Sequence, residues 1–183
     1  MATLSSFTFL TLNGFYKGLD EDISWHKHGS EEEEFSRTSL EAENILLFGR
    51  TTYEMMAGFW PTPMALESMP AVAEGMNRSE KIVVSRTLKK ATWNNTRVVG
   101  KNWIEEIKKL KQGNKNITLL GSGSILTQLA AEGLLDYCSF MIDPVAIGKG
   151  STVFAQLEKP LSMTLLDTRV FNSGVVLVSY KVS

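Results

Sequence analysis

Cysteine and histidine are scarce in this sequence. The 183 residues include 1 cysteine, Cys138, so an intrachain disulfide is impossible and a reducing compartment fits best. The 2 histidines, His26 and His28, have no cysteine or histidine partner at the spacing of metal ligands. We therefore expect surface histidines and predict no metal site.

Export and membrane segments are also lacking. The N-terminal stretch MATLSSFTFLTLNG has no basic region, and its apolar alternation is too short and too polar for a signal peptide or a membrane span. With 19 Lys and Arg against 20 Asp and Glu, the chain has no net positive charge to attract a phosphate backbone, so nucleic acid is not expected as a partner. These absences predict a cytoplasmic protein that binds neither membranes nor nucleic acid.

Several signature motifs are missing or incomplete. There is no G-x-S-x-G sequence, and the serines have no evident histidine and acid partners, which disfavours a hydrolase. The run GKGS at 148–151 is not a P-loop, because Lys149 is followed by Gly150. The run GSGSIL at 121–126 lacks the third glycine of the dinucleotide-binding fingerprint.

Strand and helix patterns alternate along the chain. Hydrophobic residues make up 43% and charged residues 21% of the sequence, which is ordinary globular usage for one domain spanning residues 1–183. The order predicts an α/β fold, with a mostly parallel central sheet of about eight strands, an antiparallel C-terminal hairpin, and helices on both faces. Strands are expected at 4–12, 44–49, 81–86, 96–100 and 116–120 and within 136–148, 161–174 and 175–182, and helices at 30–43 and 50–59 and after 102 and 123.

Capping signals and loops complete this outline. Ser30 with Glu33, and Asn102 with Glu105, have the spacing of capping boxes and predict two helix starts. The segments between the first strand and Ser30, and from 60 to 80, are expected to be connections without regular structure.

Three strand-to-helix or strand-to-loop junctions carry small or basic residues. They are Gly121–Ser124, the sequence that starts with Gly49 and Arg50, and the pair Ser85 and Arg86. Taken singly, the first reads equally well as a plain turn or an anion site, and Arg50 as a solvated surface charge or a phosphate ligand. Because ligands of open α/β sheets bind outside the carboxyl ends of the strands, the convergence of all three favours a polyphosphate ligand.

The order of these motifs resembles a known family. SFTFLTLNGF, LLFGRTTYEMM, KIVVSRT and ITLLGSGSILTQLAAEGLLDYCSFMIDPVAIGKGSTVF, followed by the hairpin strands, are similar to the dihydrofolate reductase-like superfamily. The most similar branch is the one related to the reductase (C-terminal) domain of the riboflavin biosynthesis protein RibD. The resemblance covers nearly the whole chain.

The resemblance implies a nicotinamide cofactor, normally NADPH, which supplies the hydride. It also implies an enzyme that reduces a small pteridine- or pyrimidine-like compound, such as dihydrofolate or the phosphoribosylaminouracil of riboflavin biosynthesis. The implied cofactor residues are Gly49, Arg50 and Thr52 at the adenosine-side phosphates, Ser85 and Arg86 at the 2′-phosphate, and Gly121, Ser122, Gly123 and Ser124 at the pyrophosphate.

The implied catalytic residues are Asn13 and Glu31. Many members of the branch have an aspartate where this chain has Asn13, which can hydrogen-bond but cannot act as a carboxylate. In folate reductases an acidic residue of the first helix binds the pterin, and Glu31 falls nearest by spacing, with Glu32, Glu33 and Glu34 beside it.

Alternatives to the enzyme are a nucleotide-binding module of the same fold without catalysis and a structural or interaction protein. The resemblance further implies a homodimer paired through the C-terminal strands, with CSFMIDPVAI and VVLVSY as the apolar surface. Both segments read almost as well as plain core strands.

Overall fold

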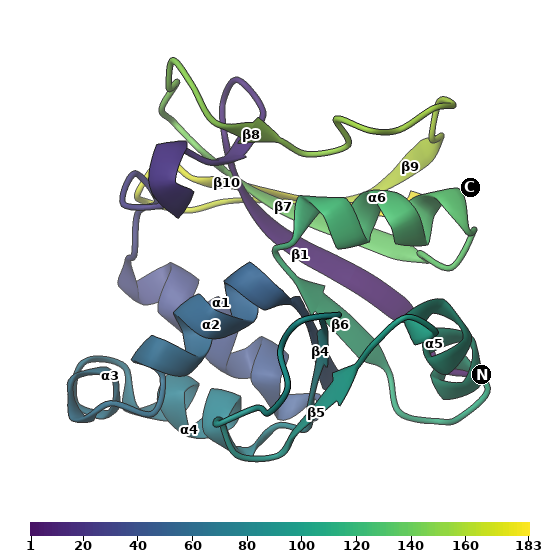
Figure 1. Cartoon of the computed structure of the whole chain (residues 1–183). Coiled ribbons are helices and arrows are strands. Elements are labelled where there is room, and N and C mark those ends of the chain that lie inside the picture. The colour runs from purple at the N-terminus through teal and green to yellow at the C-terminus, as the bar shows by residue number, and fades with distance from the viewer.

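A central sheet organises the chain, which a computed structural model describes from residue 1 to residue 183. Figure 1 shows the sheet with helices on both sides. Its strand order is β5-β4-β3-β6-β1-β7-β10-β9, and β2 and β8 form a separate antiparallel pair. The strands are β1 (Leu4–Thr11), β2 (Phe15–Lys17), β3 (Ile45–Gly49), β4 (Lys81–Val84), β5 (Thr96–Val99), β6 (Ile117–Leu120), β7 (Tyr137–Asp143), β8 (Ser151–Thr152), β9 (Met163–Val170) and β10 (Val176–Val182).

Pairing is parallel from β5 to β7 and antiparallel in the last two ladders, β7–β10 and β10–β9. The helices are α1 (Ser30–Glu41), α2 (Arg50–Phe59), α3 (Pro63–Ser68), α4 (Pro70–Arg78), α5 (Trp103–Lys111) and α6 (Gly123–Ala131), with a 3₁₀ turn at Leu19–Glu21. This arrangement confirms the predicted fold class. No helix combines the length and apolar composition needed to cross a membrane.

Successive side chains of a strand point to opposite faces of the sheet, so the residues of one strand pack into two different cores. On β3, Ile45 and Leu47 join the cluster beneath α5 and α6, whereas Leu46 and Phe48 join the cluster beneath α2 and α4. All five residues of β3 are buried, as expected for a strand with helices on both faces.

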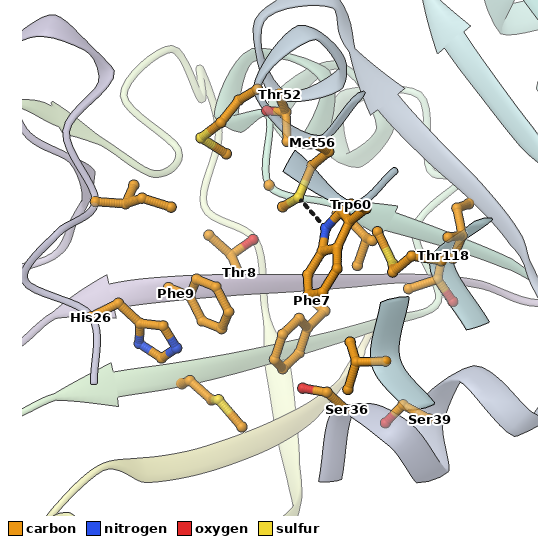
Figure 2. Close-up of a pocket in the computed structure, with 18 of the residues that line it drawn as sticks. Phe7, Thr8, Phe9, His26, Ser36, Ser39, Thr52, Met56, Trp60 and Thr118 are labelled. Atoms are coloured by element: carbon orange, nitrogen blue, oxygen red, sulfur yellow. Dashed lines mark hydrogen bonds between the residues drawn. The ribbon is translucent and has the colours of Figure 1, made fainter. Parts of the chain in front are cut away.

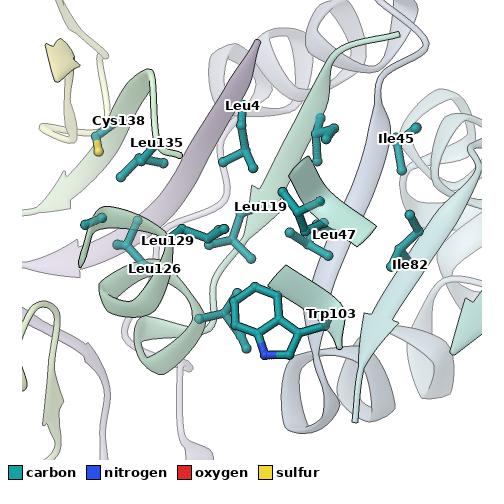
Figure 3. Packing of buried hydrophobic residues seen from close by; sticks show 14 of the residues in the cluster. Leu4, Ile45, Leu47, Ile82, Trp103, Leu119, Leu126, Leu129, Leu135 and Cys138 are labelled. Carbon is teal, nitrogen blue, oxygen red and sulfur yellow. The ribbon is translucent and has the colours of Figure 1, made fainter. Parts of the chain in front are cut away.

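The face under α5 and α6 is filled by one continuous cluster of 17 buried residues. Figure 3 shows Leu119 of β6 and Leu47 of β3 packed against Leu126 and Leu129 of α6, with Trp103 of α5 beside them. Leu119, Leu126 and Leu129 are fully buried. Most of the hydrophobic stabilisation therefore lies on this face.

The opposite face has a divided core. A cluster of 7 buried residues lies under α2 and α4, and a separate cluster of 4 lies around Phe171 at the C-terminal end of the sheet. Phe7, Phe9 and Phe35 border the second cluster. The space between the two clusters is the cavity described below.

Lys81 opens β4 with its side chain fully buried on the divided face. Its Nζ donates hydrogen bonds to Met76 O (2.8 Å), Asn77 O (3.2 Å) and Ser79 O (2.6 Å), and lies 4.5 Å from the centroid of the Trp93 ring. These carbonyls belong to the end of α4, where the helix dipole favours a cation. Burial nevertheless lowers the pKa of Lys81 to about 8.

Three local predictions need correction. The 60–80 connection contains α3 and α4, each with a proline in its first turn, where the missing N–H costs no hydrogen bond. The segment before Ser30 contains β2 and the 3₁₀ turn. The capping box at Ser30 is wrong, because α1 is capped by Gly29 and has no side-chain cap, and Asn102 caps α5 without a side-chain hydrogen bond.

The first of the two C-terminal segments does not expose the expected surface. In CSFMIDPVAI, the side chains of Cys138, Phe140 and Met141 are buried and β7 is paired on both sides, so this segment is a core strand. The exposed apolar side chains lie on the edge strand β9, at Leu165, Leu166 and Val170.

Candidate active site

A cavity of about 1040 Å³ lies on the divided face of the sheet. It runs from the carboxyl ends of β1, β3 and β6 inward beneath α1, α2 and α4. Figure 2 shows Phe7 and Phe9 of β1 and Met56 and Trp60 of the α2 region around this space, with Ser36 and Ser39 of α1 at its side. Its size is enough for a large organic ligand.

Two strand ends meet at the mouth of the cavity. Gly49 N donates to Ser122 Oγ (2.7 Å), and Thr52 Oγ1 lies 3.2 Å from the same hydroxyl. A Cβ on Gly49 would overlap Ser122 Oγ, and Gly121 has φ +61° and lies against Thr52. Glycine is therefore required at both strand ends, at one for close approach and at the other for its backbone conformation.

The same junction brings together the first turns of α2 and α6. Neither helix has a side-chain cap, so the backbone N–H groups of both first turns point outward without a side-chain acceptor. Gly49, Arg50, Thr52, Gly121, Ser122 and Ser124 all line the cavity. Two adjacent helix N-termini suit an anion with more than one phosphate.

Arg50 links this junction to the loop after β4. Its Nη1 donates to Thr87 Oγ1 (2.7 Å), and its Nε forms an ion pair with Glu54 (3.1 Å). Arg86 is exposed beside Thr87, outside the cavity wall. Ser85 is buried, and its Oγ accepts hydrogen bonds from Thr87 N (3.2 Å) and Leu88 N (2.9 Å), which shapes this loop.

Gly123 does not line the cavity. A Cβ at this position would collide with the ring of Tyr16, which itself lines the cavity. The close neighbour of Gly123 is therefore an aromatic side chain. The role of Gly123 at a pyrophosphate stays a prediction.

The two residues predicted to be catalytic lie outside the cavity wall. Asn13 is exposed, and its Nδ2 donates to Ile147 O (2.8 Å) while its Oδ1 accepts from Thr11 Oγ1 (2.8 Å), so it ties the turn after β1 to the loop after β7. Glu31 accepts a hydrogen bond from Asn172 N (2.7 Å) at the C-terminal hairpin turn. Their catalytic roles stay predictions.

Glu32 is the acidic residue of α1 that is buried and lines the cavity. Its carboxylate accepts a hydrogen bond from Ser173 Oγ and lies against Gly29. Glu32 lines the cavity and Glu31 does not, because successive residues of an α-helix face different directions and Glu32 faces the sheet.

The surface assignment of His26 is wrong. Its side chain is buried, its ring stacks on Phe9 with centroids 3.6 Å apart, and its Nδ1 lies 2.7 Å from Asp143 Oδ2. Asp143 Oδ1 accepts from Lys27 N (2.8 Å). A carboxylate only accepts hydrogen bonds, so an ionised Asp143 would pair with the Nδ1–H tautomer of His26 and leave Nε2 as the other nitrogen of the ring.

His28 extends this group at the cavity. Its ring centroid lies 4.6 Å from that of His26, and both histidines line the cavity. Partial loss of hydration and the neighbouring His26 lower the pKa of His28, although Asp143 and Glu32 oppose the shift. The cavity thus holds a histidine pair and a buried carboxylate, groups that can hold and move a proton.

Comparison with known protein families identifies the family of this chain. A family model described as the RibD C-terminal domain matches residues 2–177. The chain belongs to the RibD C-terminal domain family. This confirms the predicted branch.

Individual relatives of this RibD C-terminal domain match nearly the whole chain. The chain is 27% identical over 173 residues to the protein YyaP of Bacillus subtilis (strain 168), covering 93% of this chain and 90% of that one. A putative riboflavin biosynthesis protein from Shewanella sp. PV-4 has the same fold, with a TM-score of 0.74, 19% identity and coverage of 100% and 99%. Dihydrofolate reductase from Enterococcus faecalis, solved with NADP(H), gives a TM-score of 0.66 at 17% identity over 99% and 96% of the two chains.

Sequence reasoning missed the His26–Asp143 pair and the apolar walls of this RibD-type cavity, and it named Glu32 only as an alternative beside Glu31. Asp143 follows an apolar strand directly and precedes Pro144, which marks it as a residue at the same sheet edge as Thr11, its partner across β1 and β7. That signal could have brought Asp143 to the site. His26 lies 117 residues away in sequence, and no local pattern connects the two.

Proposed function

We propose that the protein is an NADPH-dependent reductase of a small, flat heterocyclic compound. The observation that carries this proposal is the junction of Gly49, Gly121 and Ser122, where two uncapped helix N-termini meet at the mouth of a large cavity. Membership of the RibD C-terminal domain family and the fold shared with a reductase solved with NADP(H) support the same proposal.

The residues present fit the cofactor. Backbone N–H groups at the starts of α2 and α6 would hold the pyrophosphate, with Thr52 and Ser124 beside them, and Arg50 and Arg86 would hold the 2′-phosphate. NADPH would supply the hydride. The chain would bind and orient both ligands and exclude water with the aromatic side chains of Phe7, Phe9 and Trp60.

Proton supply falls to residues that the structure places in the cavity. His26, oriented by Asp143, can donate a proton through one ring nitrogen and recover it from solvent through His28. Glu32 can accept a hydrogen bond from an N–H group of a heterocycle.

Fluorescence titration with NADPH tests this function, followed by NADPH oxidation assays with a panel of flat heterocyclic compounds that includes dihydrofolate and the phosphoribosylaminouracil. Saturable NADPH binding is expected, together with oxidation of NADPH in the presence of at least one compound of the panel. Binding without oxidation across a broad panel of heterocycles would identify a nucleotide-binding module, and absence of NADPH binding would refute the proposal.

We also propose that two copies pair through the C-terminal edge of the sheet. The exposed Leu165, Leu166 and Val170 of β9 support this interface, because an unpaired edge strand with apolar side chains favours association. Light scattering at micromolar concentration is expected to give twice the 20.3 kDa mass of the chain. A monomer mass would refute the dimer.

A further inference from the structure

The inner part of the cavity is apolar. We call the inner chamber the space bordered by Ser36, Ser39 and Leu40 of α1, Met55, Met56 and Phe59 of α2 with its C-cap Trp60, Met76 of α4 and Thr118 of β6. Figure 2 shows the Trp60 ring beside Phe7, with Met56 above and Ser36, Ser39 and Thr118 around the space. Flat apolar and flexible thioether side chains together suit an aromatic ligand.

Charged side chains line the mouth of the cavity and not the inner chamber. The cations of the lining are Lys17 and Arg50, and both are paired, with Glu21 (2.6 Å) and Glu54 (3.1 Å). The other charged lining residues are the carboxylates Glu32 and Glu33, together with His26 and His28.

The nearest cations outside the lining are also engaged. Arg37 of α1 does not line the cavity and forms ion pairs with Glu34 and Glu41 on its own helix. Lys81 is held by three carbonyl oxygens. A phosphate or carboxylate in the inner chamber would therefore lose its hydration without gaining a cationic partner, which is strongly unfavourable.

Two hydrogen-bond donors in the inner chamber have poor partners or none. Trp60 Nε1 lies 3.0 Å from Met56 Sδ, a thioether that accepts hydrogen bonds only weakly. The Ser36 hydroxyl makes no hydrogen bond within the chain, whereas Ser39 Oγ donates to Phe35 O (2.8 Å). The weakly bonded indole N–H of Trp60 and the unpaired hydroxyl of Ser36 both match a neutral carbonyl oxygen on a ligand.

We infer that the inner chamber binds an uncharged, flat heteroaromatic compound with ring carbonyl groups, of the alloxazine type, and rejects compounds with a phosphate or carboxylate tail. This inference deepens the proposed function by naming the class of its substrate. As substrate, the compound would take a hydride from NADPH at one atom and a proton at another, leaving NADP⁺ and the dihydro compound. The phosphorylated and glutamylated compounds suggested by the family resemblance are then not substrates.

Binding measurements test the inference without turnover. Lumichrome, a neutral alloxazine, is titrated with the protein in the presence and absence of NADP⁺, and its fluorescence is followed. The matched pair riboflavin and FMN, which differ by one phosphate, is titrated in the same way with NADP⁺ present. We expect saturable binding of lumichrome and at least tenfold weaker binding of FMN than of riboflavin.

Either of two results would overturn the inference: no saturable binding of lumichrome up to its solubility limit, or FMN binding as tightly as riboflavin. The separate NADPH titration keeps this result apart from the proposed function. A protein that binds lumichrome but not NADPH has the inner chamber without the reductase, and one that binds NADPH but not lumichrome has the cofactor site without this substrate class.

Two variants of α1 supply a matched comparison. Ser36→Arg introduces a cation at the inner chamber and is expected to reduce the preference for riboflavin over FMN at least tenfold. Thr38→Arg places the same side chain on the exposed side of the helix, outside the cavity lining, and should leave the preference unchanged. An equal effect of both variants would contradict the inference. Trp60→Phe keeps an aromatic ring at this position, removes the donor and part of the stacking area, and should weaken lumichrome binding threefold to tenfold.

Discussion

The two faces of the sheet differ in how completely they are packed. Under α5 and α6, 17 buried residues form one continuous cluster, whereas on the opposite face clusters of 7 and 4 residues are separated by a cavity of about 1040 Å³. Both faces are built from the same strands, whose side chains alternate between them. The comparison shows that one face can supply stability while the other is left free to bind a ligand.

The largest effect is expected from neighbouring residues of β6 that face opposite ways. Leu119 is fully buried in the continuous cluster, and Leu120 lines the cavity. Leu119→Ala should lower the free energy of unfolding by about 3 kcal/mol, because it leaves a void in a filled core, and Leu120→Ala by roughly half as much or less. Urea unfolding of both variants measures this. Equal losses would show that the two faces contribute alike.

A pH dependence should come from Lys81 on the divided face. Burial lowers its folded-state pKa to about 8 from 10.5, so between these values the unfolded chain binds more protons and stability rises with pH. Below pH 8 Lys81 is charged in both states, and the full free-energy cost of burying its charge lowers the stability. Unfolding free energies should increase by up to about 3 kcal/mol from pH 7.5 to 10.5 in the native protein.

The Lys81→Met variant should lose most of that increase. Lys89→Met, at an exposed position, serves as the control and should keep it. If the native protein and Lys81→Met show the same slope with pH, burial of Lys81 is not its source.

Substitution of Gly49 tests the junction of α2 and α6 at the mouth of the cavity. Gly49→Ala would push the new methyl group against Ser122 Oγ and disturb the junction of α2 and α6. We expect NADPH affinity to fall at least tenfold, or about 1.4 kcal/mol. Gly58→Ala, on α2 with open space around it, should leave affinity unchanged. Normal NADPH binding by a folded Gly49→Ala protein would remove the junction from the cofactor site.

Cofactor choice should depend on Arg86. Arg86→Ala is expected to weaken NADPH binding about tenfold and leave NADH nearly unchanged, because a charge-assisted contact to the 2′-phosphate contributes about 1.5 kcal/mol or more. Arg78→Ala, an exposed arginine at the end of α4, is the matched control. Parallel titrations with both cofactors measure the effect, and equal losses for the two would place Arg86 away from the 2′-phosphate.

The smallest effect concerns Thr8 of β1. Its buried hydroxyl, like that of Ser6, has no hydrogen-bond partner. Thr8→Val keeps the shape of the side chain and should raise the free energy of unfolding by about 1 kcal/mol. Thr164→Val, at an exposed site on β9, should change it little. A loss of stability in Thr8→Val would indicate a partner for the hydroxyl.

Local patterns were sufficient for the sheet and for the junction of α2 and α6 at the mouth of the cavity. Apolar runs such as NILLFG specify buried strands, and the glycines that follow β3 and β6 mark the places where α2 and α6 start close together. α3 was missed because its 6 residues are too few to show a clear helical period. α4 has 9 residues, as α5 and α6 do, but it follows α3 directly with only Met69 between the two, so no loop separates their patterns. Their prolines at Pro63 and Pro70 were the available start signals.

The part of the cavity around His26 and Glu32 depends on contacts that no local pattern encodes. His26 lies in the loop before α1, stacks on Phe9 of β1 and from there reaches Asp143 on the neighbouring strand β7. Glu32 rather than Glu31 reaches the cavity because of the rotation of α1. The inner chamber is a space left between helices. Its existence depends on how far apart α1, α2 and α4 pack, and residue types alone do not set that distance.

The start of α1 is fastened to the C-terminal hairpin. Glu31 accepts a hydrogen bond from Asn172 N, Glu32 accepts one from Ser173 Oγ, and Lys27 Nζ donates to Ser173 O (3.2 Å). One wall of the cavity and the turn between β9 and β10 therefore form a single mechanical unit. A ligand that displaces α1 would also displace the hairpin, and any contact that fixes the β9 edge would oppose this movement. Ligand binding in the cavity and binding at the β9 edge would therefore be energetically coupled, with the same coupling free energy in both directions.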